Sequence, residues 1–111
     1  MAAELGYFTI SVKDVPRAMK FYGALFGWTF EQSGNGAHIN NTEFPLGLAQ
    51  GEPVDLHFAY FRIADMVATT AKVKSLGGSV KSQNEYPSGL NAVCIDDQGT
   101  MFSLWQPAPG F

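Results

Sequence analysis

The chain has 111 residues, a formal net charge of −3, one cysteine and an aromatic share of 14%. This length suits one domain, and a single cysteine excludes an internal disulfide. Because no Lys/Arg-rich run and no apolar run of membrane-spanning length is present, we expect no nucleic acid partner, no membrane partner and a cytoplasmic location.

Residues 8–27 predict a strand followed by an amphipathic helix. Phe8, Ile10 and Val12 alternate with polar residues, as in a half-buried strand. Asp14 is a suitable N-cap, and Pro16 fits the first helical turn. Apolar residues then recur at helical spacing, and the helix is expected to end at a glycine: Met19, Phe21, Tyr22, Leu25, Phe26 and Gly27.

The rest of the first half predicts three short strands. Residues 28–31 alternate, residues 33–36 have the composition of a hairpin turn, and residues 37–40 follow as the next strand. Residues 47–50 predict a fourth strand, and residues 51–53 a linker.

The second half repeats this order. A shift of 51 positions places Val12-Lys13-Asp14 on Ile63-Ala64-Asp65, and Gly27 on Gly78. Strands are predicted at residues 56–63, 80–83, 92–96 and 101–106, a helix at 66–76, a loop at 86–89 and a tight turn at 97–99. The chain therefore predicts one α+β domain, residues 1–111, made of two β-α-β-β-β modules at about residues 5–51 and 54–107.

Alternation predicts that one side of these strands faces the helix of the module: Phe8, Ile10, Val12, Ala59, Phe61, Ile63, Phe102 and Leu104. In each module, the strand residues that point away from the helix share a character. They combine aromatic bodies, hydroxyl groups and one guanidinium: Tyr7, Thr9, Ser11, Phe58, Tyr60, Arg62, Met101, Ser103 and Trp105. Such residues suit a pocket for a small, partly apolar molecule, although they could also face solvent or fill a barrel interior. His38 could join this face as an acid–base group or lie there incidentally. Cys94 sits in an apolar strand, which favours a buried structural thiol over a reactive one.

Several sequence blocks together resemble the vicinal oxygen chelate superfamily, also called the glyoxalase/bleomycin-resistance/dioxygenase superfamily. They are Val12-Lys13-Asp14, Met19-Lys20-Phe21-Tyr22, Leu25-Phe26-Gly27-Trp28, Leu76-Gly77-Gly78 and residues 94–105. The resemblance implies two modules whose sheets form a curled mixed sheet around a site, often completed by dimerisation. We therefore expect a homodimer.

The enzymes of this family usually hold a divalent metal through the first and last strands of each module. Those ligand positions fall here on Tyr7, Phe58, Ser103 and the stretch Gly47–Ala49. Phe, Gly and Ala side chains are not metal ligands, and Tyr is only an occasional one. The resemblance thus predicts the fold but not the family's usual metal chemistry.

Three functions remain open from the sequence. The first is a binder of a small aromatic or hydrophobic molecule, without cofactor, in a cavity between the modules, in which Arg62 pairs an anionic or carbonyl oxygen and Trp105 stacks on a flat group. The second is a glyoxalase-like lyase or isomerase, or a dioxygenase-like enzyme, with a divalent metal held by residues such as His57, His38, Glu31 or Glu43. The third is a scaffold without a ligand.

Overall fold

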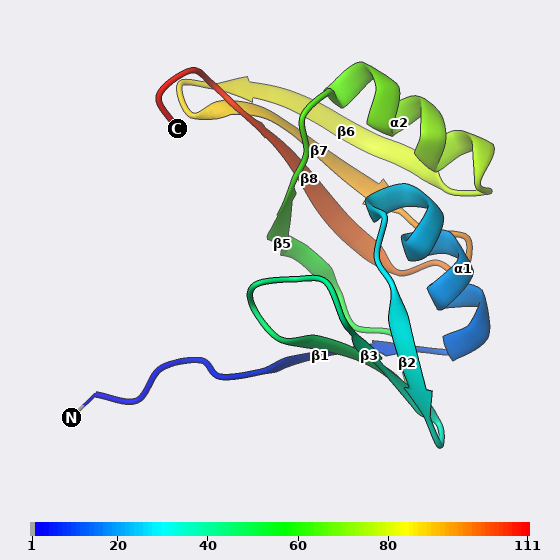
Figure 1. Ribbon diagram of the computed structural model, residues 1–111. Helices are drawn as coiled ribbons and strands as arrows, with labels where there is room; N and C mark the ends of the chain where they lie inside the picture. The colour runs from blue at the N-terminus through cyan, green and yellow to red at the C-terminus, as the bar shows by residue number, and fades with distance from the viewer. Residues whose placement is uncertain (1) are drawn as a thin grey trace. The chain divides into compact units, whose positions relative to one another are not determined.

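The computed structural model describes residues 2–111 and contains two compact units. The first unit extends to Val54, and the second runs from Asp55 to Phe111. Each contains one helix and one four-stranded sheet in the order β-α-β-β-β (Figure 1). The predicted α+β fold of two βαβββ modules is confirmed. None of the helices within residues 2–111 is both long and apolar enough to cross a membrane.

The sheet of the first unit is mixed. Its elements are β1 (Phe8–Val12), α1 (Val15–Phe26), β2 (Phe30–Ser33), β3 (Gly36–Ile39) and β4 (Leu46–Gln50). The strand order is β1-β4-β3-β2, with β1 parallel to β4 and the other pairs antiparallel. The N-terminal strand thus pairs with the last strand of its own module, which closes the unit.

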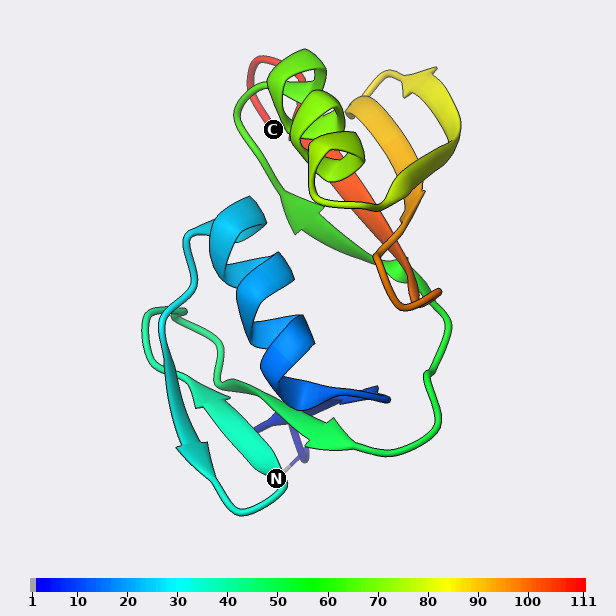
Figure 2. The same ribbon diagram turned by 90° about the vertical axis from the view of Figure 1, so that its right-hand side faces the viewer.

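The sheet of the second unit has the same plan. Its elements are β5 (Leu56–Arg62), α2 (Met66–Ser75), β6 (Ser79–Tyr86), β7 (Gly89–Ile95) and β8 (Met101–Pro107). The order is β5-β8-β7-β6, and again only the pair of first and last strands is parallel. In Figure 2, α2 lies across one face of this sheet, which leaves the other face for a site.

Both helices begin where the capping residues predict. The Asp14 carboxylate accepts a hydrogen bond of 3.0 Å from the backbone N of Arg17, and Asp65 accepts one of 3.1 Å from Ala68. These bonds satisfy backbone donors that the helix itself leaves free. α1 ends at Gly27, whose φ of 71° is the left-handed conformation that glycine adopts without strain.

Each helix packs on the apolar face of its own sheet. In the first unit, Ile10, Val12 and Leu48 are buried with Phe21 and Tyr22 of α1. In the second unit, the buried apolar set comprises Leu56, Met66, Val73, Ala92, Cys94, Phe102 and Leu104. Four of the predicted helix-facing residues are core residues: Ile10, Val12, Phe102 and Leu104. The other four are half-buried: Phe8, Ala59, Phe61 and Ile63.

Two details of the second sheet differ from the sequence expectation. The strands β6 and β7 extend to Tyr86 and Gly89, so the predicted loop shrinks to a turn at residues 87–88. The second difference is an irregularity in the pairing of β5 with β8. Leu56 pairs with Phe102 and Tyr60 pairs with Ser103, so an advance of four residues on β5 matches an advance of one residue on β8. The three extra residues of β5 reverse which side of the sheet its side chains face. Leu56 therefore lies in the core, although a regular strand would place it on the same face as the outward-facing Tyr60.

Candidate functional site

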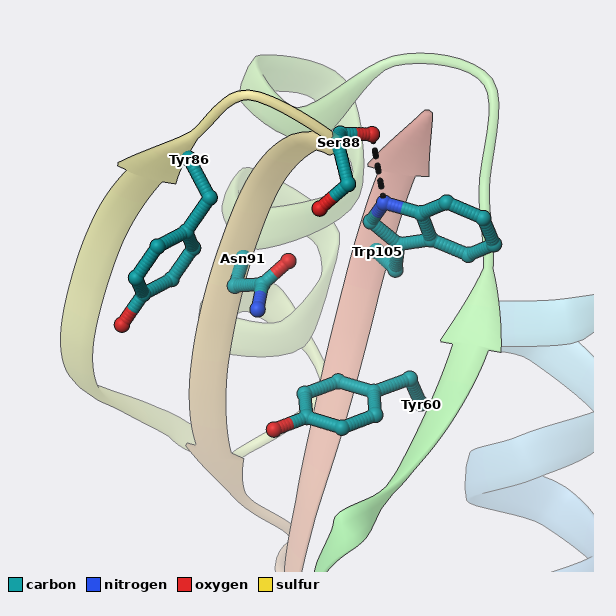
Figure 3. A pocket seen from close by; sticks show the side chains of 5 residues that line it. All are labelled: Tyr60, Tyr86, Ser88, Asn91 and Trp105. Atoms are coloured by element: carbon teal, nitrogen blue, oxygen red, sulfur yellow. Dashed lines mark hydrogen bonds between the residues drawn. The ribbon is translucent and has the colours of Figure 1, made fainter. Parts of the chain in front are cut away.

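An open pocket of about 610 Å³ lies on the second unit, at the face of the sheet that α2 leaves uncovered. Its lining combines three aromatic rings with one hydroxyl and one amide: Tyr60, Tyr86, Ser88, Asn91 and Trp105 (Figure 3). A mostly aromatic concavity with a few neutral polar groups is typical of small-molecule sites.

The strand register brings these residues together. Trp105 of β8 is paired with Asn91 of β7 on one side and with Arg62 of β5 on the other. Residues that are directly paired point to the same face of a sheet, so the three side chains share one surface. Tyr86 comes from the end of β6 and Ser88 from the turn that follows, which carries both to the same end of the sheet.

Trp105 is held in one orientation by two contacts. Its indole Nε1–H donates a hydrogen bond of 3.0 Å to the backbone oxygen of Ser88, drawn as the dashed line in Figure 3. The guanidinium carbon of Arg62 lies 5.1 Å from the centre of the ring, within cation–π range. The indole is therefore a pre-oriented platform and needs little ordering when a ligand stacks on it.

The guanidinium of Arg62 is already engaged. Besides its contact with Trp105, its Nη2 donates a hydrogen bond of 2.9 Å to the backbone oxygen of Phe111. Arg62 is not among the residues that line the pocket. In this structure Arg62 contacts the Trp105 ring from outside the pocket lining.

Asn91 presents a polar group that the protein does not satisfy. Its Oδ1 is buried and has no hydrogen-bond partner within residues 2–111. A buried acceptor without a partner costs roughly 1–3 kcal/mol, so the Asn91 amide is a polar group of the pocket whose hydrogen bonding the protein leaves incomplete.

The predicted site residues of the second unit divide between the pocket and its surroundings. Tyr60 and Trp105 line it. Ser103 is completely buried, and its hydroxyl donates a hydrogen bond of 2.6 Å to the backbone oxygen of His57. Phe58 is 79% exposed and its ring lies 3.9 Å from that of His57, and Met101 is half-buried opposite Ile95.

Three lining residues were missed from the sequence. Asn91 lies two residues from Val93, on the face that Trp105 and Ser103 occupy, and correct pairing of β7 with β8 would have found it. Tyr86 and Ser88 were assigned to a loop, and only the longer hairpin shows that they reach Trp105.

The predicted site residues of the first unit form a separate polar group. Tyr7 and His38 share a hydrogen bond of 3.0 Å between the hydroxyl and Nδ1, and their rings stack. Thr9 and His38 are both paired with Gly47, and Glu31 is paired with His38. A row of polar side chains thus crosses the face of this sheet that points away from α1.

The positions that the family uses for metal ligands do not form a donor set here. Tyr7 is hydrogen-bonded to His38, Phe58 has no donor atom, and the Ser103 hydroxyl is committed to the backbone. Within residues 2–111, no cluster of three His, Cys, Asp or Glu side chains could hold a metal ion. The residues present therefore do not fit the family's metal centre.

His57 belongs to a local pair. Asp55 Oδ1 accepts hydrogen bonds from the backbone N of His57 at 2.9 Å and from its Nδ1 at 2.7 Å. These bonds, the backbone one first, lower the pKa of the Asp55 carboxyl below its ordinary value. Because Nδ1 is the donor, Nε2 is the ring atom left to act as a base or ligand.

Comparison with known proteins agrees with the fold. The profile of the glyoxalase-like domain matches residues 7–105. The chain belongs to the glyoxalase-like domain family. It is also 35% identical over 104 residues to "Putative glyoxylase CFP32" of Mycobacterium tuberculosis and of Mycobacterium bovis, with 83% of this chain covered. The glyoxalase-like chain spans only 40% of the length of these relatives.

Solved structures share the arrangement of this glyoxalase-like domain at low sequence identity. The fosfomycin resistance protein FosX of Listeria monocytogenes, solved with Mn(II) and 1S,2S-dihydroxypropylphosphonic acid, superposes with a TM-score of 0.79 at 19% identity, covering 98% of this chain and 94% of that one. A glyoxalase/bleomycin resistance protein/dioxygenase family enzyme of Burkholderia phytofirmans gives 0.78 at 16% identity, covering 96% and 100%. At these identities the likeness establishes the fold.

Proposed function

We propose that this glyoxalase-like domain binds a small, partly aromatic molecule in the pocket of its second unit, without a metal at the family's ligand positions. The observation that carries the proposal is the pre-oriented indole of Trp105, fixed by Ser88 and Arg62 at the wall of an open pocket of about 610 Å³. Pockets of this size and composition accommodate ligands of a few rings.

The pocket differs from the first expectation of a cavity between the modules. All five lining residues belong to the second unit. Tyr60 and Tyr86 are each about half exposed, 48% and 50%, and could cover a bound ring.

The test is a screen of aromatic fragments by NMR, using the two indole N–H signals of the chain. Trp105 reports on the pocket, and Trp28, in the first unit beside Tyr22 and Phe26, is the internal control. Trp105→Phe should weaken binding of the best fragment about tenfold, measured on the signals of the fragment itself, since it removes both ring area and the hydrogen bond to Ser88. Trp28→Phe is the matched control and should leave binding unchanged. Equal effects of the two substitutions would contradict the proposal.

A metal-dependent lyase, isomerase or dioxygenase-like enzyme is the second candidate. It is favoured by the glyoxylase name of the 35% identical relatives and by the Mn(II) in the Listeria structure. The Asp55–His57 pair is one acid–imidazole combination available to such a site. Metal analysis of protein purified without chelator separates the candidates: one divalent ion per chain would favour the enzyme, and a content far below that would favour the binder.

We also propose a homodimer in the cytoplasm. Phe58, 79% exposed, and Val67, 81% exposed, are apolar side chains that a second chain could cover. The single cysteine, buried and free, suits a reducing compartment. Sedimentation equilibrium tests the homodimer, and a monomer at all concentrations would overturn it. Cell fractionation tests the cytoplasmic location.

A further inference from the structure

We propose that the pocket selects an uncharged, planar ligand that presents a carbonyl oxygen to Asn91, such as an aromatic carboxamide or lactam, and that it rejects the corresponding carboxylate. This inference rests on the proposed binding function and adds the chemical class of the ligand.

The charge of the pocket is the first argument. None of the five lining side chains carries a formal charge. Arg62, which supports the pocket from the Trp105 side, is bonded to the backbone of Phe111 and does not line the cavity. A carboxylate would lose hydration on entering and meet no charged side chain in the lining, whereas a neutral amide loses much less. The net charge of −3 also disfavours the approach of anions.

The amide of Asn91 is the second argument. Figure 3 shows its oxygen toward Ser88 and Trp105, and its nitrogen toward the Tyr60 side. Oδ1 is buried and Nδ2 is turned toward the Tyr60 side of the pocket, so we expect a ligand to meet Nδ2. This –NH₂ group is a hydrogen-bond donor, so the matching ligand atom is an acceptor such as a carbonyl oxygen.

The remaining groups favour an amide over a simple ketone. The hydroxyls of Tyr60, Tyr86 and Ser88 line the same pocket. Each hydroxyl can accept a hydrogen bond as well as donate one. A hydroxyl of the pocket can therefore accept a hydrogen bond from the N–H of a carboxamide while the carbonyl oxygen of that carboxamide accepts one from Asn91. The three aromatic rings then provide faces for a flat ring system.

Three fragments of similar size test the inference: benzamide, benzoate and toluene. Each is titrated at neutral pH into the intact chain, and the shift of the Trp105 indole N–H is followed with that of Trp28 as internal control. Benzamide should bind at least about tenfold more tightly than benzoate, because only benzoate loses the hydration of a charge on entering the uncharged lining. Equal or tighter binding of benzoate would overturn the inference.

Substitutions of Asn91 identify the hydrogen bond. Asn91→Leu should weaken benzamide about tenfold and leave toluene unchanged. Asn91→Asp, which keeps the size and removes the donor, should also weaken benzamide, so the result does not depend on how one variant folds. The matched control is Asn84→Leu, because Asn84 is paired with Asn91 on β6 but does not line the pocket.

The outcomes distinguish the inference from the proposed function. If toluene and benzoate shift Trp105 and benzamide has no advantage, the pocket binds small molecules but the carbonyl selection is wrong. If none of the three fragments shifts Trp105 at millimolar concentration, both the selection and the binding function are overturned.

Discussion

The Tyr7 hydroxyl reaches His38 Nδ1, at 3.0 Å, by passing over the backbone of Gly47. Gly47 of β4 is paired with Thr9 of β1 and with His38 of β3, so it lies between the strands that the hydrogen bond spans. A Cβ on Gly47 would collide with the Tyr7 hydroxyl and would lie 3.1 Å from the backbone oxygen of Ala37. The absence of a side chain here is what allows the contact.

Gly47→Ala should therefore destabilise the protein by about 1 kcal/mol, because the exposed Tyr7 side chain can swing away but then loses its hydrogen bond to His38. Chemical denaturation measures the change. In a Tyr7→Ala background the cost of Gly47→Ala should fall, because the main clash is gone. Gly6→Ala is the control, since a Cβ at Gly6 meets nothing within 4 Å. An equal cost in both backgrounds would show that Tyr7 does not occupy this space.

Ser103 stands where the family places a carboxylate ligand, and its burial makes that carboxylate costly. Ser103→Ala should cost about 1 kcal/mol through loss of the hydrogen bond to His57. Ser103→Glu should cost about 3 kcal/mol or more, because it buries a charge without a partner. The same changes at Ser82, exposed on β6, should stay within about 0.5 kcal/mol. A stable Ser103→Glu protein that gains a bound metal would contradict this account.

The Asp55 carboxyl should titrate below its ordinary pKa of 3.8, because the ionised form accepts two hydrogen bonds from His57. The lowered pKa of Asp55 in the folded state adds to the free energy of unfolding at pH values above 3.8. This contribution is lost as the pH falls through the pKa that Asp55 has in the folded protein. NMR titration of the carboxyl carbon measures the midpoint. His57→Ala should return it only part-way, since the backbone bond is the largest cause and survives. A full return would show that the imidazole dominates.

Cys94 should be unreactive toward thiol reagents in the folded protein. It is completely buried, and burial raises the pKa of its thiol from 9.0 to about 11. The unfolded state therefore releases this proton first, so stability falls as the pH rises from about 9 to 11. Denaturation of wild type and Cys94→Ala across this range isolates the effect, which should be absent from the variant. Rapid labelling at neutral pH under native conditions would contradict the prediction.

Local signals in the chain were sufficient for the elements and their order. Asp14 and Asp65 cap their helices as expected, because a cap depends on residues only three positions apart. Alternation likewise identified Ile10, Val12, Phe102 and Leu104 as core residues, because it reports which side of a strand meets the helix.

Only the tertiary structure decided how the site is assembled. Three extra residues between Leu56 and Tyr60 reverse which face of the sheet the side chains of β5 occupy. No local sequence pattern predicts this irregularity. Arg62 is hydrogen-bonded to the backbone of Phe111, far along the chain, and lies beside Trp105, contacts that the sequence did not predict. The length of the β6–β7 hairpin sets which residues stand beside Trp105. The hydrophobic periodicity of a sequence depends only on residues that are close together in the chain. The contacts of the site depend on the pairing of strands that are far apart in the chain, so periodicity cannot predict them.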